Sequence, residues 1–397
     1  MNQLVRAKRK VYRFGFGESP FPPPARIQSA LGRAAHRTEY TDVAGLLALR
    51  EGIAAFHHEA DGYPISSEQV LVAPGTKPLL HNVMQAFQRA DIFLPGPSWV
   101  SYAPQALIAG HNVIRIPTSY ESRWRVLPEA LHRAIRQHSA DGRQKILVLN
   151  YPGNPDGLTY SRAELKALAQ VLRAHKAWAI SDEIYALLDH AGTHVSLASL
   201  YPERTMVSTG LSKWCGAGGW RLGALILPPE RPQALYDALI GLGSETYSCA
   251  SAPIQFAALA AYELNGDIQR FLAAQRRILA GIGRAIYRKL QDTGLRLHSP
   301  QGGFYLLLDF SPFAQPLAQR GISTDELLCD RLLDESGVAL LPGTAFGMPA
   351  EALAARLAYV DFDGEAALQD GEDFDAHVGL HAAKMLEGIA ALDAWLR

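Results

Sequence analysis

The sequence predicts an α/β protein with a mostly parallel sheet covered by helices on both faces, followed by a smaller α+β domain. Short apolar runs with the length of buried strands alternate with helical stretches up to about residue 265 of the 397-residue chain. After that point the pattern changes to long helices rich in alanine, leucine and arginine. Alternation of strands and helices favours a parallel sheet, because each crossover helix covers one face.

Composition gives no sign of a nucleic-acid or membrane partner. The formal net charge is −1, and 48% of the residues are hydrophobic, which is enough for a large core. Basic residues crowd only the first 13 positions, and we interpret them as a solvated arm because no apolar signal-peptide core follows. The three cysteines form no Cys-x-x-Cys pair, so no disulfide framework or metal site is expected. We therefore expect a soluble cytoplasmic protein.

The first elements lead from an extended segment into the sheet. Residues 14–24 are rich in glycine and proline, which predicts an extended strap rather than a core element. Apolar residues at helical spacing predict a helix from Leu46 to His58, and Val70 to Ala73 is the first buried strand. A tight turn at Gly75 and Thr76 follows. Such a turn directs free backbone N–H groups along the next helix axis, where a phosphate is a natural ligand.

Residues that could take part in binding or catalysis follow the later strands. The expected strands are Ile92–Leu94, Val113–Ile116, Ile146–Leu149, Trp178–Ser181, Met206–Thr209 and Ala224–Leu227, with helices such as 162–175 between several of them. Trp99, Asn154, Asp182 and Lys213 each come after one of these strands. Ligands of parallel sheets collect at the carboxyl ends of the strands, so we expect these side chains to lie together.

The last third of the chain predicts the smaller domain. A strand is expected in 302–309, the apolar stretches 338–347 and 356–360 follow it, and a final helix is expected near 381–396. We assign residues 1–39 to the strap and part of the small domain, 40–285 to the large domain and 286–397 to the rest of the small domain. The acidic, turn-rich stretch 361–375 is expected to be a surface loop.

Lys213 is the residue around which the site is predicted. It lies in a run of small residues, from Gly210 to Gly219, that lets the backbone approach a bulky ligand closely. A lysine amine in a closed site can form a Schiff base with an aldehyde cofactor. If that cofactor is pyridoxal 5′-phosphate, its pyridine nitrogen needs an anionic partner, and Asp182 is placed for that role.

Other residues complete a site for such a cofactor. Asn154 and Tyr185 can hydrogen-bond the ring hydroxyl, and Trp99 offers a flat face for stacking. Arg356 has the planar fork that binds a substrate carboxylate in a bidentate manner. The expected phosphate contacts come from backbone N–H groups and short or basic side chains, at Gly75, Thr76, Lys77, Ser212 and Arg221.

At these residues the chain resembles the fold-type I pyridoxal-phosphate enzymes, and specifically the class I/II aminotransferase family, over nearly its whole length. The resemblance rests on Asn150-Tyr-Pro-Gly-Asn-Pro-Asp-Gly157, on Ser181-Asp-Glu-Ile-Tyr185 and on Leu211-Ser-Lys213 with Gly-Gly-Trp-Arg221. It implies ping-pong transfer of an amino group between an L-amino acid and a 2-oxo acid, with Lys213, Tyr185 and Asp182 as catalytic residues.

The resemblance also implies a homodimer with shared active sites. Tyr40 matches the tyrosine that reaches the phosphate of the neighbouring subunit, and Gly17 matches a strap glycine that lies over the substrate. Gly17, Asn154 and Arg356 are therefore the implied substrate-binding residues.

Three features depart from the family pattern. Asp156 stands where threonine is usual. Gly210 stands where many members place a phosphate-binding serine, so this contact is lost or is taken over by Ser208 or Thr209. No charged residue lies from Ser101 to Gly110, which disfavours aspartate as the preferred donor.

Several alternatives stay open. A β-lyase, a ring-forming synthase or an oxidase would keep the same cofactor residues, and a ligand sensor could reuse the fold. Gly216-x-Gly218 does not continue as a dinucleotide-binding motif, because Arg221 occupies the third glycine position. His190 and His194 lie in a predicted loop, and we interpret them as structural or solvated residues.

Overall fold

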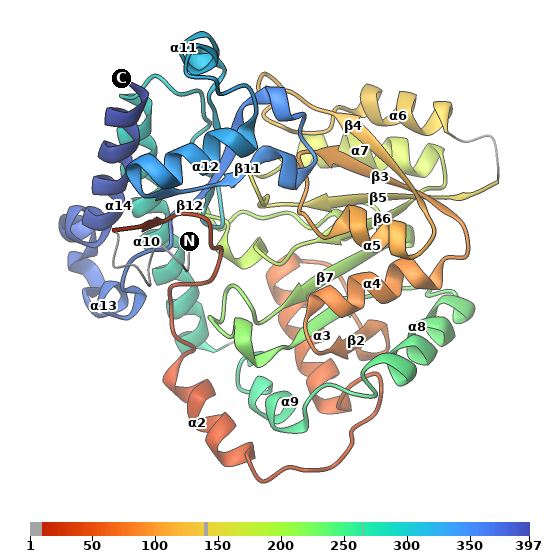
Figure 1. The fold of residues 1–397 in the computed structure, drawn as a ribbon. Coiled ribbons are helices and arrows are strands. Elements are labelled where there is room, and N and C mark those ends of the chain that lie inside the picture. The colour runs from red at the N-terminus through yellow and green to blue at the C-terminus, as the bar shows by residue number, and fades with distance from the viewer. Residues whose placement is uncertain (1–9, 139–141, 264) are drawn as a thin grey trace.

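The computed structural model describes residues 10–138, 142–263 and 265–397, and a seven-stranded sheet lies at its centre (Figure 1). The strand order is β2-β8-β7-β6-β5-β3-β4, and neighbouring strands are parallel apart from the two pairs that involve β8. The predicted fold class is confirmed. The strands are β2 (Val70–Ala73), β3 (Ala90–Gly96), β4 (Asn112–Pro117), β5 (Gln144–Asn150), β6 (Trp178–Asp182), β7 (Thr205–Gly210) and β8 (Gly223–Ile226).

Helices cover both faces of this sheet. They are α3 (Leu47–Asp61), α4 (Thr76–Ala86), α5 (Tyr102–Ile108), α6 (Pro128–Gln137), α7 (Arg162–Ala174), α8 (Gln233–Thr246) and α9 (Ala252–Ala258). Ile146 and Val148 of β5 belong to an apolar cluster with residues of α4, α5 and α8, whereas Leu147 and Leu149 belong to another with α6 and α7. Successive residues of a strand point to opposite faces, so a strand buried on both faces is apolar throughout.

A smaller lobe follows, built on the antiparallel sheet β11-β12-β9. Its strands are β9 (Tyr305–Asp309), β10 (Val338–Ala339), β11 (Leu341–Pro342) and β12 (Ala354–Ala358), and its helices are α10 (Gly266–Gln291), α11 (Ala314–Gln319), α12 (Asp325–Ser336), α13 (Gly364–Gln369) and α14 (Phe374–Leu396). The predicted boundary after residue 285 falls inside α10, and the division into domains stays a prediction.

The amino-terminal segment packs on this lobe. β1 (Tyr12–Arg13) pairs in parallel with β10, which places the red start of the chain beside the blue end in Figure 1. The segment is extended, as its prolines predict, and the helix α2 (Ala25–Ala34) follows it. The prediction that it is a strap rather than a core element is wrong in part, because Phe14 and Phe21 are both buried in the main apolar cluster. An extended chain can still bury alternate side chains, which the glycine and proline content does not reveal.

The prediction of a surface loop at 361–375 is also wrong. This stretch contains α13 and the first residues of α14, and Phe374 is fully buried. Its acidic residues act locally: the Asp363 carboxylate accepts the N–H of Ala366 at the start of α13, and the Asp370 carboxylate bonds to His377 and His381. A stretch whose aspartates cap helices has the same amino-acid composition as a polar loop, which explains the error.

The register of the sheet brings the predicted site residues to one edge. Asn150, the last residue of β5, is paired with Asp182, the last residue of β6, and Asp182 is paired with Ser208 of β7. The loops that follow these strands therefore start at the same level. Among the described residues, no helix is both long enough and apolar enough to cross a membrane.

Candidate active site

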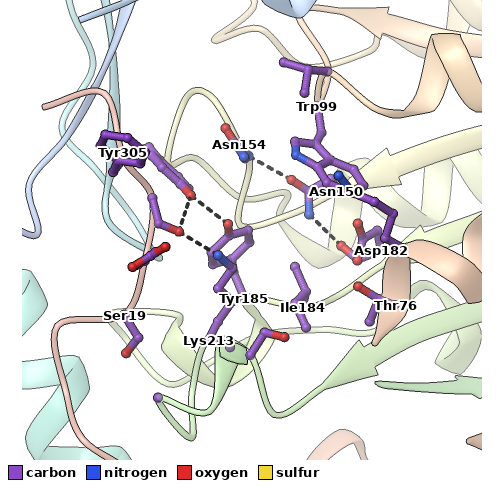
Figure 2. A pocket seen from close by; sticks show the side chains of 18 of the residues that line it. Ser19, Thr76, Trp99, Asn150, Asn154, Asp182, Ile184, Tyr185, Lys213 and Tyr305 are labelled. Atoms are coloured by element: carbon purple, nitrogen blue, oxygen red, sulfur yellow. Dashed lines mark hydrogen bonds between the residues drawn. The ribbon is translucent and has the colours of Figure 1, made fainter. Parts of the chain in front are cut away.

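A cavity of about 890 Å³ lies at this edge, between the sheet and the small lobe (Figure 2). Eleven of the predicted site residues line it: Gly17, Thr76, Lys77, Trp99, Asn154, Asp182, Tyr185, Ser212, Lys213, Arg221 and Arg356. Gly75 lies directly behind the lining, against Arg221. Tyr40 is elsewhere, with 89% of its surface exposed.

Lys213 points from the loop after β7 into the cavity (Figure 2). Its Nζ donates to the backbone carbonyl of Gly17 at 2.6 Å, and it stands 5.7 Å from the ring centroids of both Tyr185 and Phe304. The amine is thus held between the sheet side of the cavity and the strap, beside two aromatic faces. A primary amine in a confined, partly apolar place is a nucleophile that an aldehyde can reach.

Asp182 presents one free oxygen at the floor of the cavity. Its side chain is buried, and the hydroxyl of Tyr102 donates to Oδ2 at 2.6 Å. Oδ1 is buried and has no hydrogen-bond partner among the described residues. Burial raises the pKa of this carboxyl to about 6, so it is ionised at neutral pH. A buried carboxylate oxygen without a partner is costly unless a ligand supplies a donor.

The Asn150–Gly157 turn carries Asn154 to the centre of the cavity. The Asn150 side chain fixes the start of this turn, since it donates to the carbonyl of Asp182 and accepts the N–H of Asn154, both at 2.8 Å. Gly157 has a φ of +68°, and a Cβ there would collide with the carbonyl of Tyr305 on β9. The turn can therefore pack closely on the small lobe only with glycine at this position.

Asp156, the departure from the family pattern, is an internal residue of the same turn. Its buried carboxylate forms an ion pair with buried Arg125 and accepts the N–H of Leu158 at 2.8 Å. Arg125 also donates to the carbonyl of Leu158 at 3.2 Å. The carboxylate and Arg125 together thus stabilise the conformation of the turn.

The start of α4 and Arg221 form a site suited to an anion. The helix begins at Thr76, where its first N–H groups have no partner within the helix. Gly75 has a φ of +99°, and a Cβ there would collide with the guanidinium of Arg221. Glycine at this position therefore lets the guanidinium lie against the helix start, and the hydroxyls of Thr76 and Ser212 belong to residues that line the same cavity.

Neither candidate for the missing serine contact reaches this site. Ser208 and Thr209 are buried and do not line the cavity. A Cβ at Gly210 would lie only 2.7 Å from the carbonyl of Leu222, so β7 and β8 approach too closely there for a larger residue.

Arg356 lies on the small-lobe side of the cavity. Its buried guanidinium donates from Nη1 to Asn154 Oδ1 at 3.0 Å and from Nη2 to the carbonyl of Gly15 at 2.6 Å. It lies over the ring of Tyr305, 4.7 Å from the centroid, and its Nε has no described partner. The fork is thus pre-oriented by neutral acceptors, which a carboxylate can replace.

Comparison with known proteins agrees with this geometry. The family model described as "Aminotransferase class I and II" matches residues 9–359. The chain belongs to this family. It is 34% identical over 356 residues to an aspartate aminotransferase of Geobacillus stearothermophilus, and the match covers 87% of each chain. It is 32% identical over 358 residues to an aspartate/prephenate aminotransferase of Cereibacter sphaeroides, covering 87% of this chain and 86% of that one.

Solved structures agree with these matches. The aspartate aminotransferase from Thermus thermophilus with maleate has a TM-score of 0.85 and 28% identity, and the match covers 99% of this chain and 94% of that one. This protein is therefore an aminotransferase of fold type I, which transfers an amino group between an amino acid and a 2-oxo acid.

Three residues of this aminotransferase site escaped the sequence-based prediction. Tyr102 holds Asp182, Asn150 holds both Asp182 and Asn154, and Tyr305 bonds to Tyr185 at 2.9 Å. Asn150 could have been found, because it ends a predicted strand at the same level as Asp182. Tyr102 and Tyr305 carry no such signal, since each looks like an ordinary core aromatic.

The two histidines of the predicted loop have structural partners in the aminotransferase. The carboxylate of Glu183, the residue after Asp182, lies 3.0 Å from Nε2 of His194, and Nε2 of His190 lies 3.1 Å from the carbonyl of Gly303. Both histidines therefore have hydrogen-bond partners among the described residues, and their interpretation as structural or solvated residues stays a prediction. Burial disfavours a charge on His194, but the bond and the charge of Glu183 outweigh it, so the pKa of His194 is raised.

Proposed function

We propose that this aminotransferase binds pyridoxal 5′-phosphate in the cavity of Figure 2 and that Lys213 is the residue that holds it covalently. One observation carries the proposal: Lys213 and Asp182 line the same cavity, and one buried carboxylate oxygen of Asp182 has no partner among the described residues. The Asp182 oxygen requires a donor, and the protonated ring nitrogen of this cofactor is one. The residues present therefore fit the group.

The anion site at the start of α4 fits the phosphate. Thr76 and Ser212 offer hydroxyls, Arg221 offers a fixed positive charge, and the helix start offers N–H groups. Trp99 on the cavity wall offers a flat face to the ring, and Asn154 and Tyr185 offer polar atoms for its hydroxyl. When bound, the cofactor supplies an aldehyde that exchanges amino groups and a ring that stabilises negative charge on the substrate's Cα.

The protein's own part is binding, orientation and proton transfer. Arg356 holds the α-carboxylate of the donor with two N–H groups, and this orients Cα in the cavity. Lys213 Nζ, once free, would move a proton from Cα of the donor to the aldehyde carbon of the cofactor, and in the opposite direction when the oxo acid reacts. Asp182, by remaining ionised, would favour a positive charge on the ring nitrogen of the cofactor. The aromatic residues around Lys213 limit the access of water.

We include dicarboxylic donors in the proposal. Relatives of this chain are named aspartate aminotransferases. A cation that could bind a second carboxylate lines the cavity. It is Lys77, whose Nζ lies 5.1 Å above the centroid of the Trp99 ring on the cavity wall. The segment from Ser101 to Gly110 lacks charge, but a partner for the side-chain carboxylate can come from α4 instead.

We also propose a homodimer in the cytoplasm. Tyr40 is 89% exposed and outside the cavity of its own chain, so it can reach a neighbouring subunit. The three cysteines are unpaired, which suits a reducing compartment. Light scattering of the purified protein and of Tyr40→Phe, with the cofactor affinity of each, tests the shared site: the variant should remain a dimer and bind the cofactor more weakly.

Replacement of Lys213 tests the function directly. Lys213→Ala is expected to lose the absorbance of covalently bound cofactor and essentially all transfer between L-aspartate and 2-oxoglutarate. Lys166→Ala, at an exposed position on α7, is the control and should behave as wild type. Wild-type activity in Lys213→Ala would refute the assignment.

A further inference from the structure

We infer that hydrogen bonds of the Tyr305 hydroxyl keep the amino-terminal strap, residues 14–19, closed over the cavity while Lys213 and Arg356 bind the cofactor and the substrate. We call this hydroxyl the clasp. The inference rests on the proposed roles of those two residues. Tyr305 is a positioning residue, and its hydroxyl joins two parts of the site. It bonds to the hydroxyl of Tyr185 at 2.9 Å and donates to the carbonyl of Gly17 at 3.4 Å (Figure 2).

The strap carbonyls accept hydrogen bonds from three side chains of the described residues. Arg356 donates to Gly15 at 2.6 Å, Lys213 donates to Gly17 at 2.6 Å, and Tyr305 donates to Gly17. Arg356 and Lys213 are the two groups that the proposed reaction needs for substrate and cofactor. When they turn to those ligands, the strap loses both of its charged donors. The neutral hydroxyl of Tyr305 then remains on Gly17, and the backbone N–H of Ala358 remains on the carbonyl of Phe14 at 2.8 Å.

The surroundings of Tyr305 favour a clasp over a passive core residue. The side chain is 1% exposed, its ring is nearly perpendicular to the Tyr185 ring with the centroids 5.6 Å apart, and the guanidinium of Arg356 lies 4.7 Å from its centroid. A Cβ at Gly17 would collide with the Tyr305 hydroxyl, so glycine is what allows the strap to approach it.

The proton count is consistent with this arrangement. Each tyrosine hydroxyl has one proton to donate and lone pairs to accept. If Tyr305 donates to Gly17, then Tyr185 donates to Tyr305 and keeps its lone pairs for a donor in the cavity. Burial, followed by the neighbouring Tyr305, raises the pKa of Tyr185 well above its usual value, so this hydroxyl retains its proton.

Glu18 offers a direct readout of strap opening, because it is an exposed strap residue where a glutamate-specific protease can cut. In the cofactor-loaded enzyme, Tyr305→Phe should be cut after Glu18 about fivefold faster than wild type, the amount expected for one lost hydrogen bond. The KM for both L-aspartate and 2-oxoglutarate should rise by a similar factor, with a smaller change in kcat. The melting temperature should stay close to that of wild type.

The matched control is Tyr359→Phe. Tyr359 is fully buried in the same lobe and its hydroxyl donates to the carbonyl of Gly303 at 3.2 Å, but it does not line the cavity. It should leave both KM values and the cleavage rate unchanged. Equal cleavage of wild type and Tyr305→Phe, or equal acceleration in both tyrosine variants, would overturn the clasp.

A second pair of variants separates this inference from the proposed function. In cofactor-free Lys213→Ala, Tyr305 is the described side chain left on the Gly17 carbonyl. Adding Tyr305→Phe should then accelerate cleavage more than the same change does in cofactor-free protein that retains Lys213. This coupling needs no cofactor and no turnover. If the wild type fails to bind the cofactor but the coupling is present, the proposed function fails and the clasp stands; additive effects would contradict the clasp itself.

Discussion

The two walls of the cavity are built in different ways. On the sheet wall, Asp182 and Asn150 end paired neighbouring strands, and hydrogen bonds between close elements hold them. On the opposite wall, Arg356 meets Gly15 across 341 residues of sequence, and Tyr305 meets Gly17 across 288. The first wall is a consequence of the parallel sheet. The second joins the strap to the paired strands β12 and β9 by single side-chain contacts. We therefore expect the sheet wall, proposed to hold the cofactor, to open less readily than the wall proposed to hold the substrate.

The largest effect should come from breaking the sheet wall at Asp182. Asp182→Asn keeps the shape but removes the negative charge that would face the ring of the proposed cofactor, so kcat/KM should fall by about a thousandfold, within the range for loss of a preorganised electrostatic contact. Steady-state kinetics with L-aspartate and 2-oxoglutarate measure it.

Asp91→Asn is the control for that variant. Asp91 is buried at the amino end of β3, where it forms an ion pair with Arg143 at 3.0 Å, far from the carboxyl edge of the sheet. The control should lose stability and keep most of its activity when folded. Similar losses of activity in both variants would mean that Asp182 acts only through folding.

A smaller effect is expected from the opposite wall. Arg356→Lys keeps the charge but loses the bidentate fork, so the KM of the amino acid and of the oxo acid should both rise about thirtyfold, which corresponds to about 2 kcal/mol. Affinity for the cofactor should change little, since the sheet wall holds it. Titration of cofactor-free Arg356→Lys with pyridoxal phosphate checks this. A large loss of cofactor affinity would contradict the assignment of cofactor binding to the sheet wall and substrate binding to the opposite wall.

The smallest effect concerns pH and the support of the sheet wall. The raised pKa of His194, which pairs with Glu183 beside Asp182, means that the folded state holds this proton more tightly than the unfolded state. The stability that it contributes is present below the histidine's ordinary pKa of 6.5 and is lost as the pH rises through the raised value. Chemical denaturation across this range should show the fall in the free energy of unfolding. In His194→Gln the fall should be reduced, and an unchanged pH dependence would contradict the assignment to His194.

Much of the sheet wall could be predicted from the sequence. The strand before Asp182 and the turn after Asn150 are local patterns, and parallel strands bring their carboxyl ends to one edge. Two other contacts could not be predicted in this way. One is the close approach of residue 157 to β9, which requires glycine there, and the other is the ion pair of Arg125 with Asp156. Both depend on contacts between segments that local periodicity does not relate.

The errors have the same origin. The stretch 361–375 has the composition of a loop, yet Asp363 caps a helix and Phe374 packs in the core. Phe14 and Phe21 lie in a segment that proline makes extended, and only the packing of the small lobe decides that they are buried.

By itself, the sequence determined the α/β class, the family and the residues that converge on the carboxyl edge of the sheet, because strand periodicity and motif order are local properties of the chain. The tertiary structure alone decided which carboxylate oxygen of Asp182 has no partner among the described residues, why glycine stands at positions 17 and 75, and that Tyr305 joins the strap to Tyr185. These features depend on distances of a few ångströms between segments far apart in sequence, and only the packing of the two lobes sets such distances.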